Sequence, residues 1–100
     1  MHKKTTLNIV FHKIREKGEA VSPFDLLWID VREIVRQLSG STRRHLRVML
    51  DDGYEEHVRY AQLLQEEFGV PVGLAVVTSG VGREGFLRLE DLYRAQERGI

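Results

Sequence analysis

Three short apolar runs alternate with three segments that carry the helical repeat, and this alternation is the strongest constraint on the fold. The apolar runs lie at 7–12, 46–50 and 72–78, and the helical segments at 23–39, 55–68 and 89–99. Because each connection between runs is long enough for a crossover, the order βαβαβα predicts parallel strands in an α/β fold. One hundred residues suit a single domain over 1–100. The continuous apolar run at 72–78 predicts a sheet buried on both faces.

Local signals are clearest for the helix over 23–39. Ser22, with Asp25 three positions later, fits a capping box at its start. Trp28 follows the helical repeat with Phe24, so we expect both in the core.

Composition excludes several classes of function. The formal net charge is zero, with fifteen basic and fifteen acidic residues, so no overall field favours nucleic acid or an acidic membrane. There is no cysteine, which excludes a disulfide framework and a thiolate metal site. The apolar run near the start is shorter than the 7 to 15 residues of a signal-peptide core, and none reaches the roughly 18 residues of a membrane span. We therefore expect a soluble, cytoplasmic protein.

Two adjacent carboxylates, Asp51 and Asp52, stand where the second apolar run ends. An Asp-Gly pair often makes a hairpin turn, but the segment after Gly53 is helical, so the element reads as strand, tight turn, helix. In parallel α/β folds such turns lie at the edge of the sheet where ligands bind. Residue chemistry alone leaves two interpretations open: a functional pair, or one turn aspartate and one capping aspartate.

Four segments in order resemble one known family. They are "IVFHKI" at 9–14, "DDGY" at 51–54, "FGVP" at 68–71 and "LEDLYRAQERG" at 89–99. This pattern resembles the polysaccharide deacetylases of carbohydrate esterase family 4, in the amino-terminal half of their catalytic domain. The resemblance implies the first units of a deacetylase-type (β/α) barrel, apparently truncated.

The resemblance also implies a hydrolase that removes acetyl groups from N-acetylated or O-acetylated polysaccharide. Asp51 would be the general base and Asp52 a ligand of a divalent metal, for which the resemblance implies zinc. His12 and Tyr54 are the candidate substrate-binding residues, because His12 follows a strand at the presumed active edge and Tyr54 adjoins the aspartates. The metal would polarise the acetyl carbonyl while the neighbouring carboxylate accepts a proton.

The chain departs from the family pattern in its histidines. The family takes two more metal ligands from an H-[ST]-x-x-H motif, which this sequence does not contain. None of its histidines has a partner at ligand spacing; they are His2, His12, His45 and His57. We expect His45 and His57 to be exposed surface residues. The 100 residues alone are therefore expected to be inactive, with an exposed sheet edge prone to self-association.

Two other functions stay open. A degenerate deacetylase fold could bind glycan or a partner without catalysis, through aromatic side chains such as Tyr54. The segment "GVGREG" at 80–85 fits the G-x-G-x-x-G pattern of dinucleotide binding. That pattern normally opens its helix directly, whereas here "FLRL" intervenes before the helical segment.

Overall fold

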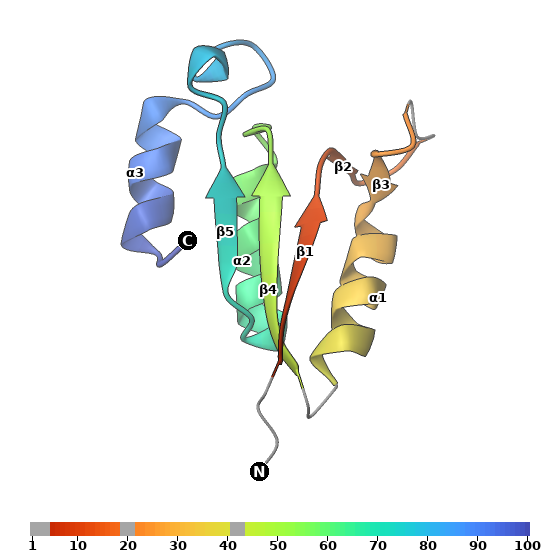
Figure 1. Ribbon diagram of the computed structural model, residues 1–100. Helices are drawn as coiled ribbons and strands as arrows, with labels where there is room; N and C mark the ends of the chain where they lie inside the picture. Colours follow the sequence, from red (N-terminus) through yellow and green to blue (C-terminus); the bar gives the residue numbers. More distant parts are fainter. Residues whose placement is uncertain (1–4, 19–21, 41–43) are drawn as a thin grey trace.

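The computed structural model describes residues 5–18, 22–40 and 44–100. The main elements are β1 (Thr5–Phe11), α1 (Trp28–Ser39), β4 (Arg44–Asp51), α2 (His57–Phe68), β5 (Val72–Ala75) and α3 (Leu89–Glu97). Shorter elements lie in the connections: β2 (Ile14–Arg15), β3 (Leu26–Leu27) and the 3-10 turn η1 (Thr78–Gly80). Parallel strands alternate with helices (Figure 1), so the predicted α/β fold is confirmed.

The central sheet has the strand order β1-β4-β5, and both pairs of neighbours are parallel. Phe11 lies opposite Leu50, and Asp51 lies opposite Ala75. The three strands therefore end at the same edge of the sheet, which is the upper edge in Figure 1. Side chains that follow these strands are brought together there.

Only one face of this sheet is covered by helices. In β4, Leu46, Val48 and Leu50 are buried against the helices, whereas the alternating positions Arg47 and Met49 are exposed. Figure 1 shows α2 behind the sheet and no helix in front of it. The expectation of a sheet buried on both faces is therefore wrong for the described part of the chain. The strands alternate between buried and exposed positions, as in a sheet with one solvated face.

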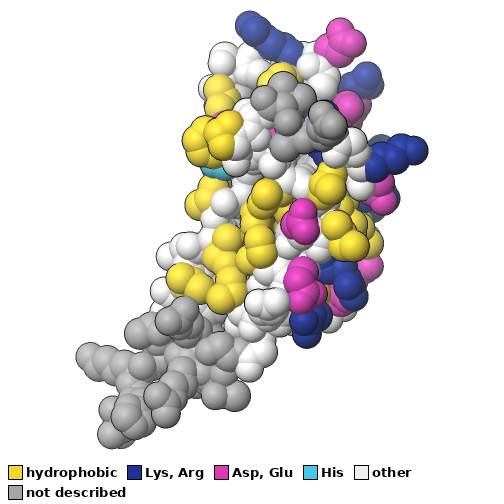
Figure 2. Space-filling model, turned by 90° about the vertical axis from the view of Figure 1, so that its right-hand side faces the viewer, with side chains coloured by type: hydrophobic (Ala, Val, Ile, Leu, Met, Phe, Trp, Pro, Cys, Tyr) yellow, Lys and Arg dark blue, Asp and Glu magenta, His cyan; other side chains and the backbone are white. Residues whose placement is uncertain are grey.

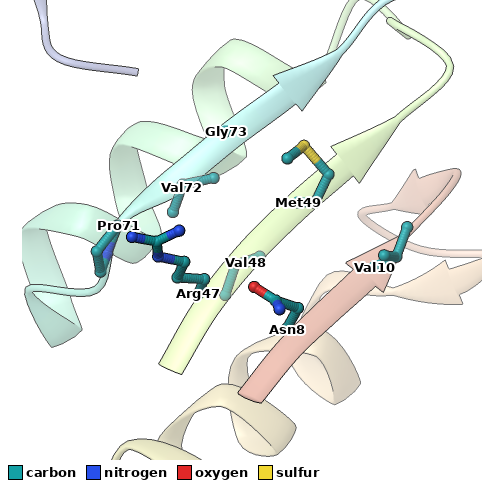
Figure 3. A pocket seen from close by; sticks show the side chains of 8 residues that line it. All are labelled: Asn8, Val10, Arg47, Val48, Met49, Pro71, Val72 and Gly73. Carbon is teal, nitrogen blue, oxygen red and sulfur yellow. The ribbon is translucent and has the colours of Figure 1, made fainter. Parts of the chain in front are cut away.

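The uncovered face carries a hollow of about 410 Å³. Figure 3 shows the side chains of Asn8, Val10, Arg47 and Met49 on the side of the sheet turned away from the helices. Gly73 of β5 leaves room for the end of the Met49 side chain, because a Cβ there would lie 3.1 Å from Met49 Cε. We call this surface the open face.

Two helices supply the other half of the core. Their buried residues recur at helical spacing: Val31 and Val35 in α1, and His57, Tyr60, Ala61 and Leu64 in α2. Trp28 packs against this core and stacks on Tyr60, with the ring centroids 4.7 Å apart. The predicted core position of Trp28 is confirmed. None of the helices in the described ranges is long and apolar enough to cross a membrane.

The helix predicted over 23–39 begins five residues later, at Trp28. Ser22 and Asp25 are hydrogen-bonded to each other, but in a turn rather than a helix cap: Asp25 N–H donates to the Ser22 carbonyl at 3.1 Å, and Ser22 Oγ to Asp25 Oδ1 at 3.2 Å. The next two residues form β3, where Leu26 N–H donates to the Lys13 carbonyl at 3.0 Å. Because this pairing holds the chain extended, Phe24 lies outside the core with 64 % of its surface exposed.

Candidate metal centre

Three side chains that can donate to a metal meet at the carboxyl edge of the sheet. His12 follows β1 directly, Asp51 is the last residue of β4, and Asp52 follows it. His12 Nδ1 lies 3.3 Å from Asp52 Oδ2 and 3.7 Å from Asp51 Oδ2. All three side chains are partly exposed, at 32 % for His12 and 38 % for each aspartate. Solvent can therefore reach the group.

The backbone at Asp52 explains why its side chain points to His12 rather than continuing the alternation of β4. Asp52 has φ +84°, a left-handed conformation that costs a non-glycine residue about 1 to 3 kcal/mol. The next residue, Gly53, has φ +75°. Two successive left-handed residues turn the chain sharply out of the strand. Strain of this kind is typical of functional sites.

The end of β5 and the loop over 76–88 fix this turn through main-chain hydrogen bonds. Asp52 N–H donates to the Ala75 carbonyl at 2.9 Å, at the end of β5. Leu87 N–H donates to the Gly53 carbonyl at 2.9 Å, and Glu55 N–H to the Gly85 carbonyl at 3.0 Å. The aspartate turn is therefore tied to the next crossover before α2 begins.

A pocket of about 300 Å³ opens beside Asp52. One wall is an aromatic pair, Tyr54 and Phe86, whose rings stack with centroids 5.3 Å apart and an interplanar angle of 21°. Arg83 and Ser79 contribute polar groups to the lining. The pocket can hold a ligand with one apolar face and several hydroxyl groups next to the carboxylates. Tyr54 lies in this lining, whereas His12 lies with the aspartates and against the ring of Phe24.

His57, which we expected at the surface, has no exposed surface at all. Its Nε2 lies 2.7 Å from the backbone carbonyl of His12, and its ring meets the ring of Tyr54 edge to face at 5.4 Å. Burial lowers the pKa of the His57 imidazole, and the bond to the His12 carbonyl opposes this only in part. The helical repeat that includes Tyr60, Ala61 and Leu64 also includes position 57, and this signal could have identified His57 as buried.

The chemistry and the spacing of these donor atoms both bear on whether they suit a metal. Two ligands of a tetrahedral zinc with bonds of about 2.0 to 2.2 Å lie about 3.3 to 3.6 Å apart. The separation of 3.3 Å between His12 Nδ1 and Asp52 Oδ2 falls in this range, whereas that of 3.7 Å to Asp51 Oδ2 is slightly longer. One imidazole nitrogen and two carboxylate oxygens suit a divalent cation, and the three donor atoms all lie within 4.8 Å of one another. These residues fit a cation, with coordination positions left for further ligands.

The other sequence candidates lie elsewhere. His45 is exposed in β4, as expected, and His2 lies outside the described residues. In the glycine-rich segment at 80–85, Gly82 and Gly85 turn the chain with φ +83° each, and α3 begins only at Leu89. The loop therefore does not open the helix as a dinucleotide fingerprint requires.

The fold is similar to about half of each of two solved structures, one of them a deacetylase. The chain superposes on the structure of IcaB from Ammonifex degensii with a TM-score of 0.69 and 16 % sequence identity. It superposes on the Streptococcus pyogenes deacetylase PplD in complex with acetate with a TM-score of 0.64 and 13 % identity.

These superpositions include 98 % and 99 % of this chain but only 51 % of the IcaB chain and 54 % of the PplD chain. The chain therefore spans about half the length of each neighbour, as a truncated barrel would. No family model matches the sequence, and no curated protein sequence matches it.

Proposed function

We propose that this chain contributes the aspartate pair of a metal-dependent deacetylase that acts on N-acetylated or O-acetylated polysaccharide. The observation that carries the proposal is the approach of His12 Nδ1 to Asp52 Oδ2, 3.3 Å apart, at the carboxyl edge of a deacetylase-like sheet. We further propose that residues 1–100 are part of one catalytic domain, because their neighbours are about twice as long.

The residues divide the work as follows. Asp52 and His12 would hold a divalent cation, for which zinc suits the donor set. When bound, the cation would supply Lewis acidity for the hydrolysis of an acetyl group. Asp51 Oδ2, 3.7 Å from His12 Nδ1, accepts the proton of the attacking water. Tyr54 and Phe86 offer aromatic surface for a sugar ring in the pocket beside Asp52.

The bound acetate of PplD supports this reading, because acetate is the acid that hydrolysis of an acetyl group releases. The left-handed conformation of Asp52 supports it as well, since the strain serves to turn a carboxylate towards His12. The further histidine ligands that the family resemblance implies are not supplied by the described residues within this cluster. Sequencing the source message beyond the codon for Ile100 shows whether they follow.

Zinc titration of the 100-residue chain tests the metal site. We expect Asp52→Asn to weaken Zn²⁺ binding in calorimetry at least tenfold, because it replaces a carboxylate donor of the cluster by a neutral amide. Asp51→Asn should change the affinity less than Asp52→Asn, because Asp51 is assigned to the proton. Asp30→Asn is the matched control, since Asp30 is an exposed aspartate in the first turn of α1. Equal affinities for wild type, Asp52→Asn and Asp30→Asn would contradict the proposal.

Glycan binding without hydrolysis is the second candidate function. The place of Tyr54 and Phe86 in the pocket lining favours it, because aromatic side chains can contact a sugar ring whether or not a metal is present. Binding of an N-acetylglucosamine oligosaccharide that is lost in Tyr54→Ala but kept in Asp52→Asn, in a chain that takes up no zinc, would support this function over the first.

A further inference from the structure

His57 is buried, yet its polar contact is with a residue of the metal centre. Its Nε2 lies 2.7 Å from the His12 carbonyl oxygen, and its side chain has no exposed surface. A carbonyl oxygen only accepts hydrogen bonds, so Nε2 carries the hydrogen and donates it. The other ring nitrogen, Nδ1, is buried and has no partner among the described residues.

This contact links two elements that come together at the metal centre. His57 is the first residue of α2, five positions after Asp52, and His12 lies just beyond β1. The bond from His57 therefore joins the segment after β1 to the helix that follows the aspartate turn. It fixes the backbone from which the His12 ring reaches Asp52.

A second contact runs parallel to the first. Lys13 Nζ lies 2.6 Å from Glu56 Oε1 and 4.7 Å from the centre of the Tyr54 ring. Both partners of Lys13 also approach His57. The Tyr54 ring meets the His57 ring edge to face, and Glu56 Oε2 lies 4.0 Å from His57 Nε2. The His12–Lys13 segment is thus held to the start of α2 at two successive residues.

Packing alone does not account for a histidine at this position. A leucine would fill a buried helix site without a polar ring that loses its hydration. Here one nitrogen stays unpaired, so the hydrogen bond to His12 is what the structure gains from the imidazole. Partners of this kind orient metal ligands, and their loss typically weakens metal binding 10- to 100-fold.

We propose that His57 is a positioning residue, whose Nε2–H holds the His12 carbonyl so that the His12 ring stays within reach of Asp52. This inference rests on the proposed function in one respect: metal affinity is its readout. Nothing in the reaction requires His57 to touch substrate or metal.

The test compares two variants of the 100-residue chain with the wild type. His57→Leu keeps the bulk and removes the donor, whereas His57→Gln keeps an N–H donor. We expect Zn²⁺ affinity in calorimetry to fall at least tenfold in His57→Leu and to recover by most of that factor in His57→Gln. Urea unfolding of each variant separates this effect from stability. Equal zinc affinities in both variants and the wild type would show a packing role only and overturn the proposal.

NMR of the wild type keeps the test decisive where His57→Leu does not fold. Nitrogen spectra of the imidazole should show the Nε2–H form of His57, with that hydrogen slow to exchange. An Nδ1–H form would overturn the proposal without any variant. A wild type that takes up no zinc would instead overturn the proposed function, and the tautomer of His57 would still decide the inference about its bond to His12.

Discussion

Tyr60 shows how a single residue of this core combines packing with a charged partner. Only 2 % of its surface is exposed, and its ring stacks on Trp28. Its hydroxyl donates to Glu16 Oε2 at 2.9 Å. Burial, together with the bond to Glu16 and the charge of that carboxylate, raises the pKa of Tyr60 to about 12. The fold therefore favours the neutral phenol.

This raised pKa predicts a loss of stability in strong alkali. The folded value of about 12 lies above the ordinary value of 10, so the unfolded chain releases the proton first. The contribution of Tyr60 is complete below pH 10 and declines as the pH rises from 10 to 12. Absorbance at 295 nm should show a tyrosine that ionises near pH 12, and this step should disappear in Tyr60→Phe. A wild type without that step would contradict the assignment.

The sequence drew attention to the aspartate pair but not to the residues around it. Asp51 and Asp52 stand out because two adjacent carboxylates repel each other, and the structure places both beside His12. His57 was wrongly expected at the surface, because a histidine in a helix with acidic neighbours resembles a solvated residue. The helical repeat with Tyr60 and Leu64 indicates its burial, but its polar partner, the carbonyl of His12, lies 45 positions away and is in no local pattern.

Among the elements, the connection between β4 and α2 matters most for the metal centre, because Asp52 lies in it. Gly53 has φ +75°, and a Cβ added there would lie 3.1 Å from Val76 Cγ1. Gly69, which ends α2, has a similar φ of +66°, but a Cβ added there would meet nothing within 4 Å. A comparison of substitutions at these two glycines separates two free-energy costs. One is the cost of a left-handed backbone, which both positions share, and the other is the cost of crowding against the loop after β5, which arises at Gly53 alone.

We expect Gly53→Ala to destabilise the chain by more than Gly69→Ala. Each variant costs about 1 to 2 kcal/mol for the left-handed alanine, and only Gly53→Ala adds the contact with Val76. Urea unfolding gives both values, and Gly53→Ala should also weaken zinc binding because Asp52 is its neighbour. Equal destabilisation by the two variants would show that Val76 moves aside freely.

The start of α1 shows the limit of local signals for elements. Ser22 and Asp25 form a hydrogen-bonded turn, which such residues also favour, so the predicted capping box was wrong although the two residues do bond to each other. The pairing of Leu26 with the Lys13 carbonyl then extends the chain and delays the helix to Trp28. A contact between two segments of the chain therefore decides where α1 begins, and the helical repeat alone does not predict that contact.

In the molecule as a whole, the open face and the unpaired side of β1 are two surfaces that no other described element covers. β1 pairs only with β4 among the described strands. Viewed from the side of β1 and α1, hydrophobic side chains gather down the middle and left of the surface, and charged ones lie mostly at its right and top (Figure 2). The parallel order was predictable from the alternation of apolar runs and helical segments, whereas the bare face was not, because alternate positions such as Val10 and Met49 are apolar too.

We propose that the isolated chain associates with a second copy through this edge and the open face. The zero net charge opposes no such contact, and apolar surface becomes buried. Sedimentation velocity should show association that rises with concentration and is weakened by Met49→Lys on the open face. Ile29→Lys, at an exposed position of α1, is the matched control and should change nothing. A monomer at every concentration would contradict the proposal.

The main-chain hydrogen bonds that hold the aspartate turn to the end of β5 and to the loop over 76–88 have a consequence for how such a site can evolve. The bonds at Asp52, Gly53 and Glu55 all join main-chain atoms, so they do not depend on the side chains of the loop. Ser79 and Arg83 line the pocket from that loop and take part in none of these three bonds through their side chains. Mutations at these two positions can therefore change the lining of the pocket while the carboxylates keep their places. A directed-evolution library confined to this loop would vary the lining of the pocket without displacing Asp51 and Asp52.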